Sequence, residues 1–414
     1  MISLAIWTFK VKAIAVVGAG TMGAGVAQLA ATHGCTVYLN DVDGDVIQCG
    51  IEGIAGRLKR SVEKGRLKRR DRDAILDRIK PANTICDLSD VDLAIEAVVE
   101  DLAVKQQVFA GLGEALPASA VLATNTSSLS ITRIAEAVED PSRVVGMHFF
   151  NPAPVMPLVE VIAGRASGEA SVDFACKAAE GWGKVPVRAK DTPGFIVNRV
   201  ARGFYLEALR LRSEGVAGVD EIDAVMRTHG KFKMGPFELM DLIGLDVNLA
   251  VSTSIWEQTG KPARFRVHEM QQQLVDQGHL GRKSGRGFYL HDVETPMPAV
   301  AVDRHSYELS PLLSDAMLAF SARAGAAQTS STERYVFCRI LSAVINEAGL
   351  LFSDNVATRK DIDIAMVKGA NYPKGPLAWA DDIGHRTVRG LLKAFNSTVS
   401  DGRYEPAPLF ADAQ

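Results

Sequence analysis

The stretch KAIAVVGAGTMGAG, residues 12–25, decides how the N-terminal part of this chain folds. Its apolar run Ala13–Val17 predicts a strand that is buried on both faces. Gly18, Gly20 and Gly23 follow in G-x-G-x-x-G spacing, and the apolar residues after them recur at helical intervals. In such a strand–turn–helix the glycines permit a tight turn, close approach of a pyrophosphate and close helix packing, while the helix N-terminus attracts phosphate. The stretch therefore predicts a dinucleotide-binding fold.

A second predicted strand, Thr36–Asn40, ends immediately before Asp41. An acid at this place in a dinucleotide-binding unit accepts the ribose 2′-hydroxyl and repels a 2′-phosphate, which favours NAD over NADP. The alternative is that Asp41 is an ordinary turn residue. We expect NAD to be held by Asp41 and by the loop residues Gly18, Gly20, Thr21, Met22 and Gly23.

The composition describes an ordinary globular protein large enough for two or three domains. The chain has 414 residues, of which 47% are hydrophobic and 23% are charged. A net charge of −3 gives no general attraction to nucleic acid or to an anionic membrane. The cysteines show neither C-x-x-C nor metal-ligand spacing, which predicts free thiols, no metal site and a cytoplasmic location. They are Cys35, Cys49, Cys86, Cys176 and Cys338.

Residues 1–9 are apolar but lack the basic region of a signal peptide, and they are too short to span a bilayer. We interpret them as a loose terminal extension.

Further strands are predicted at residues 92–98, 120–124, 143–147 and 158–162, with helical stretches between them. This alternation is typical of a doubly wound parallel sheet, where ligands bind at the carboxyl ends of the strands. Between these elements, residues 42–78 are helical in pattern and rich in lysine and arginine. Either this segment is a solvated helix face, or it docks a polyphosphate ligand. Nucleic acid is a poor fit because aromatic residues do not interleave with the basic ones.

The chain repeats itself at a fixed offset of 140 residues in its C-terminal half, and the repeat sets the expected domains. We expect an NAD-binding domain over 10–190, a helical domain over 191–291, a connector over 292–332 and a second, degenerate helical copy over 333–414. Cys338 stands where the first copy has Asn198. The repeated positions are Arg199/Arg339, Glu207/Glu347, Asp223/Asp363, Gly235-Pro236/Gly375-Pro376, Asp241/Asp381 and Gly244/Gly384.

His148 directly follows a predicted core strand at the ligand end of the sheet, and Glu160 lies on the neighbouring predicted strand. A dehydrogenase that acts on an alcohol needs a base for the hydroxyl proton, and histidine has a suitable pKa. A carboxylate beside the imidazole would fix its tautomer. A structural, hydrogen-bonded histidine is the alternative that His148 alone would favour.

Three motifs resemble those of the L-3-hydroxyacyl-CoA dehydrogenases: TNTSS at 124–128, HFFNP at 148–152 and DTPGFIVNR at 191–199. The resemblance covers residues 11–291 almost continuously. It implies NAD-dependent oxidation of a 3-hydroxyacyl-CoA, with an α/β Rossmann-type domain followed by helical domains. The expected fold is thus a doubly wound parallel sheet and two tandem all-α copies.

The resemblance also assigns roles. His148 would be the general base, Glu160 its orienting acid, and Ser127 and Asn198 the groups that hold the substrate. On the CoA side it implies Lys64, with Arg57 and Ser127. The positions that it places along the cofactor are Glu100, Lys105, Asn125, Ser127, Asn151 and Lys283.

The second helical copy departs from single-copy members of the family, which pair through this domain. We expect the copy to serve as a built-in partner, with one active site per chain, although higher association is possible. A dehydrogenase of a non-CoA hydroxy or sugar acid, of the gulonate type, and a non-enzymatic crystallin-like relative are the alternatives. The acyl group is left open: short, long and dicarboxylyl chains all fit.

Overall fold

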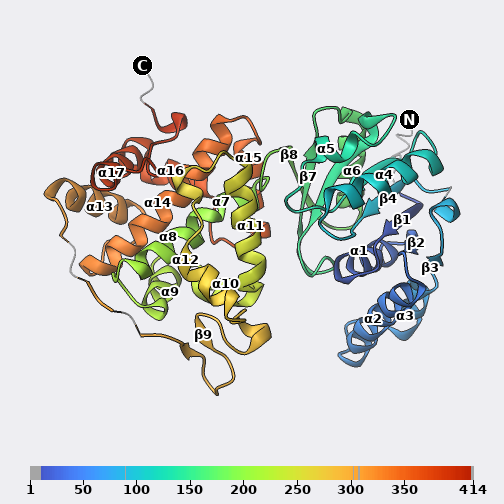
Figure 1. The fold of residues 1–414 in the computed structure, drawn as a ribbon, viewed down its shortest axis with the longest axis horizontal. Coiled ribbons are helices and arrows are strands. Elements are labelled where there is room, and N and C mark those ends of the chain that lie inside the picture. Colours follow the sequence, from blue (N-terminus) through green and yellow to red (C-terminus); the bar gives the residue numbers. More distant parts are fainter. Residues whose placement is uncertain (1–10, 89, 302, 306–307, 412–414) are drawn as a thin grey trace, which may run out of the picture. The chain divides into compact units, whose positions relative to one another are not determined.

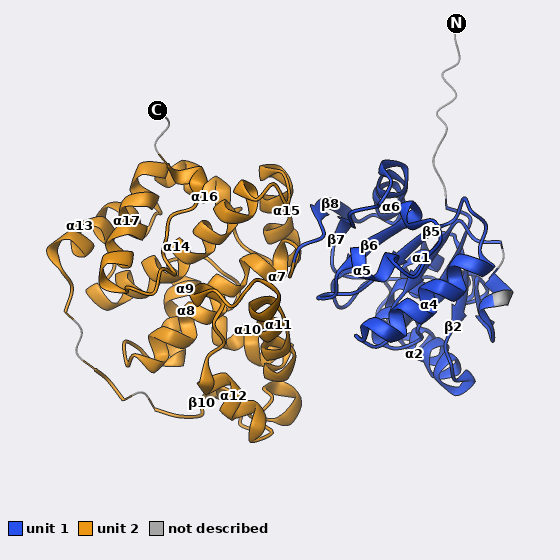
Figure 2. Ribbon diagram, turned by 45° about the horizontal axis from the view of Figure 1, so that its top comes forward, with its two compact units in different colours: residues 1–192 blue, residues 193–414 orange. Residues whose placement is uncertain are grey.

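The computed structural model describes residues 11–411 apart from 89, 302 and 306–307, and it divides the chain into two compact units (Figure 2). Unit 1 is Met1–Thr192 and unit 2 is Pro193–Gln414. Both helical copies and the segment between them belong to unit 2. The expected terminal extension, residues 1–9, lies outside the described residues.

Unit 1 is built on one mixed sheet of eight strands in the order β3-β2-β1-β4-β5-β6-β7-β8 (Figure 1). The first six run parallel in the order of a dinucleotide-binding sheet, which confirms the predicted Rossmann-type fold. β7 is antiparallel to β6, and β8 then runs parallel to β7. The strands are β1 (Ala13–Val17), β2 (Thr36–Asn40), β3 (Ile79–Ala82), β4 (Leu93–Glu96), β5 (Val121–Thr124), β6 (Val144–Phe149), β7 (Leu158–Ala163) and β8 (Val185–Lys190).

The two edge strands, β3 and β8, were not expected from the sequence. Each contains a proline, Pro81 in β3 and Pro186 in β8. Proline lacks a backbone donor, so it is tolerated at a sheet edge but weakens any strand signal in the sequence. The basic segment 42–78 forms two helices, Gly44–Glu63 and Arg69–Leu76, which confirms its predicted helical character.

Helices cover both faces of the sheet. α1, α2 and α6 pack their apolar side chains into one continuous core with alternate residues of the strands. α4 and α5 contact the sheet around β4, β5 and β6 through the other set of side chains. The helices are α1 (Thr21–Thr32), α2 (Gly44–Glu63), α3 (Arg69–Leu76), α4 (Leu102–Ala115), α5 (Ile131–Ala135) and α6 (Glu169–Gly181).

Unit 2 is mainly helical, and its elements repeat at the 140-residue offset. The bounds of α10 and α16, and those of α11 and α17, coincide when shifted by 140 residues. The segment 292–332, expected to be a connector, contains α13, which packs against α14 and α17. The helices are α7 (Val197–Val200), α8 (Arg202–Ser213), α9 (Val219–Thr228), α10 (Pro236–Ile243), α11 (Leu245–Gln258), α12 (Glu269–Asp276), α13 (Pro311–Arg323), α14 (Ser331–Ser353), α15 (Arg359–Gly369), α16 (Pro376–Ile383) and α17 (His385–Thr398), with short strands β9 (Tyr289–Leu290) and β10 (Met297–Pro298).

The repeated Asp-Gly-Pro positions build the same helix start in both copies. Asp223 accepts the backbone N–H groups of residues 237 and 238 at 2.9 Å each, and Asp363 accepts those of residues 377 and 378 at 2.8 and 3.0 Å. A carboxylate here satisfies amide groups that the first helical turn leaves without partners. A side chain at Gly235 or Gly375 would collide with that aspartate, which explains the glycine before each proline.

The two copies are joined by reciprocal ion pairs across their contact. Arg199 of the first copy bonds Glu347 of the second at 2.7 Å. Arg339 of the second bonds Glu207 of the first at 2.9 Å through Nη2. Because each contact has its counterpart at the 140-residue offset, the packing of α8 on α14 has the reciprocal form of a two-fold interface. The backbones meet at Gly203, where a Cβ would lie 2.9 Å from the backbone nitrogen of Val344.

α14 is long and apolar enough to cross a bilayer by length and composition, and the bent pair α10–α11 meets the same criterion jointly. The apolar window of α14 is, however, 78% buried within the unit. Its hydropathy is accounted for by its contacts with α13 and α16 on one side and with α8 of the first copy on another (Figure 1).

Candidate active site

The glycine loop between β1 and α1 has the shape that a pyrophosphate requires. Gly18 has a φ of 103°, and a side chain there would collide with the carbonyl of Ala97 at 2.5 Å. A Cβ on Gly23 would lie 1.7 Å from the carbonyl oxygen of Gly18, so only glycine lets α1 pack this close. Gly20, in contrast, faces open space at the N-terminus of α1. The loop is therefore tightly packed at Gly18 and Gly23 but open at Gly20, which leaves space for a dinucleotide phosphate at the helix N-terminus.

Asp41 is fixed against this loop. Its Oδ2 accepts the backbone N–H of Ala19 at 2.7 Å, and its Oδ1 accepts that of Val42 at 2.8 Å. The carboxylate thus lies at the end of β2 beside the glycine loop, where a ribose hydroxyl would need an acceptor.

A buried ion-pair cluster supports the loops after β4 and β5. Lys105 is 1% exposed, and its Nζ bonds Glu96 at 2.7 Å and lies 3.3 Å from Glu100. Glu96, which is fully buried, also accepts the hydroxyl of Thr124 at 2.7 Å. Glu96 was not predicted as a site residue, although an acid inside the apolar run of β4 is a visible signal in the sequence. Lys105 is thereby placed as a support of the loop rather than as an exposed lining group.

Glu100 organises the turn that carries Ser127. Its Oε1 accepts the backbone N–H groups of Ser127 and Ser128 at 3.0 and 3.1 Å and the hydroxyl of Thr126 at 2.6 Å. Burial would raise the pKa of Glu100, but Lys105 and these donors outweigh it and lower the pKa. The carboxylate is therefore held as an acceptor, and it fixes the half-buried Ser127.

Asn125 links the ends of two strands at the same edge. Its Oδ1 accepts the backbone N–H of Phe149 at 2.9 Å, so the β5 loop is tied to the end of β6. Asn151 follows on the exposed turn after β6. Both residues lie at the carboxyl edge of the parallel strands, as the topology requires for ligand binding.

His148 and Glu160 are opposite one another on the antiparallel pair β6–β7. The imidazole Nδ1 lies 2.6 Å from Glu160 Oε2. The Glu160 side chain is fully buried and that of His148 is 8% exposed. Because a carboxylate only accepts hydrogen bonds, Nδ1 carries a proton, and Nε2 of the neutral ring is the basic nitrogen. His148 lies within β6, whereas the sequence had placed it just after the strand.

Comparison with known proteins agrees with this geometry. The model of the 3-hydroxyacyl-CoA dehydrogenase NAD-binding domain matches residues 13–192, and that of the C-terminal domain of the same enzymes matches 194–291 and again 335–413. This chain belongs to the 3-hydroxyacyl-CoA dehydrogenase family. It is an NAD-dependent oxidoreductase of that class, and the second match confirms that the helical domain is duplicated.

Relatives of this 3-hydroxyacyl-CoA dehydrogenase include both single-copy and two-copy proteins. The chain is 38% identical to 3-hydroxyadipyl-CoA dehydrogenase of Escherichia coli, over 97% of each protein. It is 40% identical to a probable 3-hydroxybutyryl-CoA dehydrogenase of Bacillus subtilis, over 69% of this chain and 99% of the relative. A crystal structure titled 3-hydroxybutyryl-CoA dehydrogenase from E. coli matches with a TM-score of 0.86 and 37% identity, over 97% of this chain and 98% of that one.

The remaining expected site residues of the dehydrogenase are found in separate places. Asn198 is a half-buried residue of α7 in unit 2, and Lys283 is an exposed residue whose Nζ pairs with Asp246 at 2.6 Å. In unit 1, Lys64 is exposed at the C-terminal end of α2. Arg57 lies on the same helix, but its Nε donates to Gln28 Oε1 at 2.7 Å.

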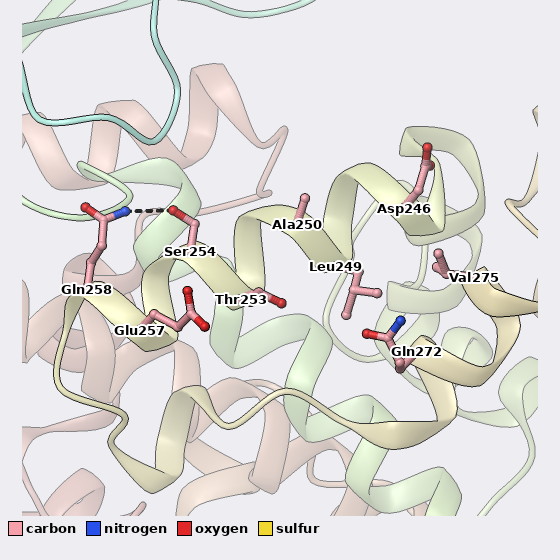
Figure 3. Close-up of a pocket in the computed structure, with 9 residues that line it drawn as sticks. All are labelled: Asp246, Leu249, Ala250, Thr253, Ser254, Glu257, Gln258, Gln272 and Val275. Carbon is pink, nitrogen blue, oxygen red and sulfur yellow. Dashed lines mark hydrogen bonds between the residues drawn. The ribbon is translucent and has the colours of Figure 1, made fainter. Parts of the chain in front are cut away.

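A pocket of about 470 Å³ lies on unit 2 between α11 and α12 (Figure 3). Gln258 Nε2 donates to Ser254 Oγ at 2.7 Å along one wall. Its two carboxylates, Asp246 and Glu257, make it unfavourable for the phosphates of CoA. None of the expected site residues lines it, so it is not the candidate active site. Its lining consists of Asp246, Leu249, Ala250, Thr253, Ser254, Glu257, Gln258, Gln272 and Val275.

Proposed function

We propose that His148 is the general base that removes the hydroxyl proton from an L-3-hydroxyacyl-CoA, and that Glu160 orients it. The observation that carries this proposal is the buried 2.6 Å bond between the two side chains on adjacent strands. Glu160 holds Nδ1, which directs Nε2 to the substrate, and its negative charge stabilises the imidazolium that forms. In the reverse reaction the same Nε2–H returns the proton to the carbonyl oxygen.

Ser127 and Asn198 are proposed to hold the substrate's oxygen atoms while the base acts. The Ser127 hydroxyl is oriented by Glu100 through the turn at 126–128. Asn198 offers an amide that both donates and accepts hydrogen bonds. Positioned polar groups of this kind lower the barrier by fixing the reacting carbon in a reactive geometry.

NAD, when bound, supplies the acceptor for the hydride that leaves C3 of the substrate. The open space at Gly20, the helix start behind it and the carboxylate of Asp41 fit its pyrophosphate and adenosine ribose. Asn125, Asn151 and Lys283 are proposed to line the nicotinamide side. Lys105 and Glu100 are proposed to contribute through the ion-pair cluster that shapes the loop.

The arm formed by α2 and α3 is proposed as the CoA side of the site. Lys64 offers an exposed ammonium group for a CoA phosphate. Arg57 is half-buried and bonded to Gln28 of α1, and burial lowers its pKa. Arg57 is therefore better suited to anchoring the arm on α1 than to binding phosphate directly.

The acyl group is not fixed by these residues. The names of the relatives include 3-hydroxyadipyl-CoA, 3-hydroxybutyryl-CoA and fatty acid oxidation enzymes. We propose a short or six-carbon acyl group, because the full-length relative with two helical copies carries the name 3-hydroxyadipyl-CoA dehydrogenase.

The experiment is to measure NADH oxidation with acetoacetyl-CoA in the wild type, in His148→Gln and in Glu160→Gln. His148→Gln should lower kcat by about 10²–10⁴-fold with little change in NADH affinity, because the base acts only in the chemical step. Glu160→Gln should be slower than wild type and should shift the pH profile of kcat/KM. His33→Gln is the matched control, since His33 caps the C-terminal end of α1, where its Nδ1 lies 2.9 Å from the backbone oxygen of Leu29, and it should retain full activity. Near-normal turnover in His148→Gln would remove this residue from the mechanism.

A further inference from the structure

Arg202 is a buried cation with only neutral partners. It is 2% exposed and is the first residue of α8. Its Nε donates to the backbone oxygen of Asn198 at 2.9 Å, and its Nη1 donates to Ser252 Oγ at 2.5 Å and to the backbone oxygen of Asn248 at 3.2 Å. Its guanidinium carbon lies 5.0 Å from the ring centroid of Tyr205. Among the residues that the structure describes, no carboxylate pairs with it.

This placement is unfavourable for a positive charge in the free protein. Burial lowers the pKa of Arg202 to about 10, a measure of how poorly its surroundings replace water. The other buried arginines at the contact of the two copies, Arg199 and Arg339, each pair with two acids. Arg202 thus differs from them in lacking an anion.

The second helical copy shows that the fold does not need this charge. At the 140-residue offset Arg202 becomes Ser342, Asn248 becomes Val388 and Ser252 becomes Leu392. α14 and α17 nevertheless form and contact one another, and α17 keeps the bounds of α11 shifted by 140 residues. The copy that lacks Asn198 therefore also lacks the cation and both of its α11 partners. The arginine is thus found in the copy that has Asn198, the residue proposed to bind substrate, and is absent from the copy that has only the helices.

We propose that Arg202 determines acyl specificity by favouring substrates with a carboxylate at the far end of the acyl chain, that is, dicarboxylyl-CoA thioesters. The inference rests on the proposed function, because it takes Asn198 to hold the substrate near C3. Residues 198 and 202 are one helical turn apart, with Cβ atoms separated by about 5–6 Å. In a six-carbon chain, C3 and the terminal carboxyl carbon are separated by three bonds, or about 4 Å. A terminal carboxylate on a substrate held at Asn198 therefore lies within the field of Arg202.

The surroundings of Arg202 explain how a buried charge acts on such a substrate. Asn248 and Ser252 fix the guanidinium from α11, and Gln271 holds the Asn248 side chain with a 3.0 Å bond to its Oδ1. The charge is therefore positioned in advance and screened little by salt. A terminal carboxylate supplies the missing counter-ion, whereas a terminal methyl group leaves the cation uncompensated.

The test compares 3-hydroxyadipyl-CoA with 3-hydroxyhexanoyl-CoA, which have the same number of acyl carbons and differ at the terminal group. The wild type should prefer the dicarboxylyl substrate in kcat/KM by about 10- to 100-fold, the range of one charge-assisted hydrogen bond. Arg202→Met should abolish that preference while changing kcat/KM for 3-hydroxyhexanoyl-CoA by less than about threefold. Arg202→Lys keeps the charge and should retain part of the preference.

Two results overturn the inference and leave the proposed function intact: a wild type that oxidises both substrates equally, or an Arg202→Met variant that loses both activities by the same factor. The second result would mean that Arg202 only supports α7. Failure of the wild type to oxidise any 3-hydroxyacyl-CoA would instead overturn the proposed function. Competition by adipyl-CoA and hexanoyl-CoA in the wild type needs no variant, and equal inhibition constants there also contradict the inference.

Discussion

The two helical copies of unit 2 differ in what they have kept. Both retain the arginine and glutamate that cross their contact and the aspartate that starts the helix after the Gly-Pro pair. The second copy has lost Asn198, replaced by a buried cysteine, and the polar group around it. Residues that build the contact are therefore duplicated, whereas residues assigned to the substrate are present once.

A single helical domain has to both form the contact with its partner and hold the substrate, and the two copies separate these roles. The reciprocal Arg–Glu bonds explain why the second copy keeps its charged residues although they are buried. Replacing one partner of a buried ion pair leaves the other charge buried without a counter-ion, so a substitution of either partner alone is strongly destabilising. The chemistry around Asn198 has no such constraint in the second copy. The copy is thus interpreted as a partner surface without a site of its own.

The largest effect is expected when the second copy is removed. A chain that ends at residue 292 exposes Arg199, Gly203 and Glu207 on α7 and α8. Two such chains can rebuild the contact, with Arg199 of each chain bonding Glu207 of the other, and we expect a homodimer or aggregate. Light scattering of the truncated and full-length proteins measures the change. A truncated chain that stays a stable, fully active monomer contradicts the idea of a built-in partner.

The next largest effect is a loss of stability, which should differ between the two reciprocal Arg–Glu contacts. Arg339→Met removes one of the two arginines that Glu207 and Glu214 share, leaving Arg403 at 3.7 Å from each, and should lower the free energy of unfolding by about 3–5 kcal/mol. Arg199→Met should cost less, because Arg199 is more exposed and one of its acids, Asp354, is 54% exposed. Urea denaturation of both variants gives the comparison. Equal losses would show that the contact is energetically symmetric.

The pH dependence of stability sharpens the same comparison. Burial alone would raise the pKa of Glu207, but Arg339, Arg210 and Arg403 outweigh it and lower the pKa to about 2. The folded pKa is below the unfolded value of about 4.3, so the stabilisation is present above that value and lost as the pH falls toward 2. The gap in unfolding free energy between wild type and Glu207→Gln should therefore shrink by roughly 3 kcal/mol from pH 6 to pH 2. A difference in unfolding free energy that stays constant with pH would falsify the lowered pKa of Glu207.

The smallest effect is expected from Cys338→Asn, which restores the residue that the second copy lacks. No second glycine loop or His148 accompanies this copy, so NADH should still bind at one site per chain and kcat should stay within about twofold. Titration of NADH binding and steady-state kinetics check this. A second equivalent of NADH bound by the variant would contradict the division of roles between the copies. Cys338→Ser, which also makes the buried site polar, controls for packing effects.

Much of unit 1 could be predicted because its signals are local. The glycine loop, the strands around it and the pair His148–Glu160 all lie on short, strongly patterned segments. The prolines of β3 and β8 concealed those strands, since they are tolerated only because both strands lie at the sheet edge. The burial of Lys105 against Glu96 could not be predicted, because it depends on how α4 packs against β4.

The helical repeat could be found from the sequence, but its contacts could not. The offset identified Arg199, Glu207, Arg339 and Glu347 as equivalent positions. It did not show that each arginine bonds the glutamate of the other copy, 148 or 132 residues away, rather than the one eight residues away on its own. That pairing depends on the crossing of α8 and α14 at Gly203.

The reciprocal contact also changes how this protein can evolve. In a dimer of identical chains every substitution appears on both sides of the symmetry axis at once, so both halves must tolerate it. Here the two halves are separate stretches of one gene product, and each can change alone. Phe232 and Tyr372 already show this: they occupy equivalent positions at the 140-residue offset, and their ring centroids lie 4.9 Å apart. Joining the two copies in one chain has turned a symmetric surface into one that can be altered one side at a time.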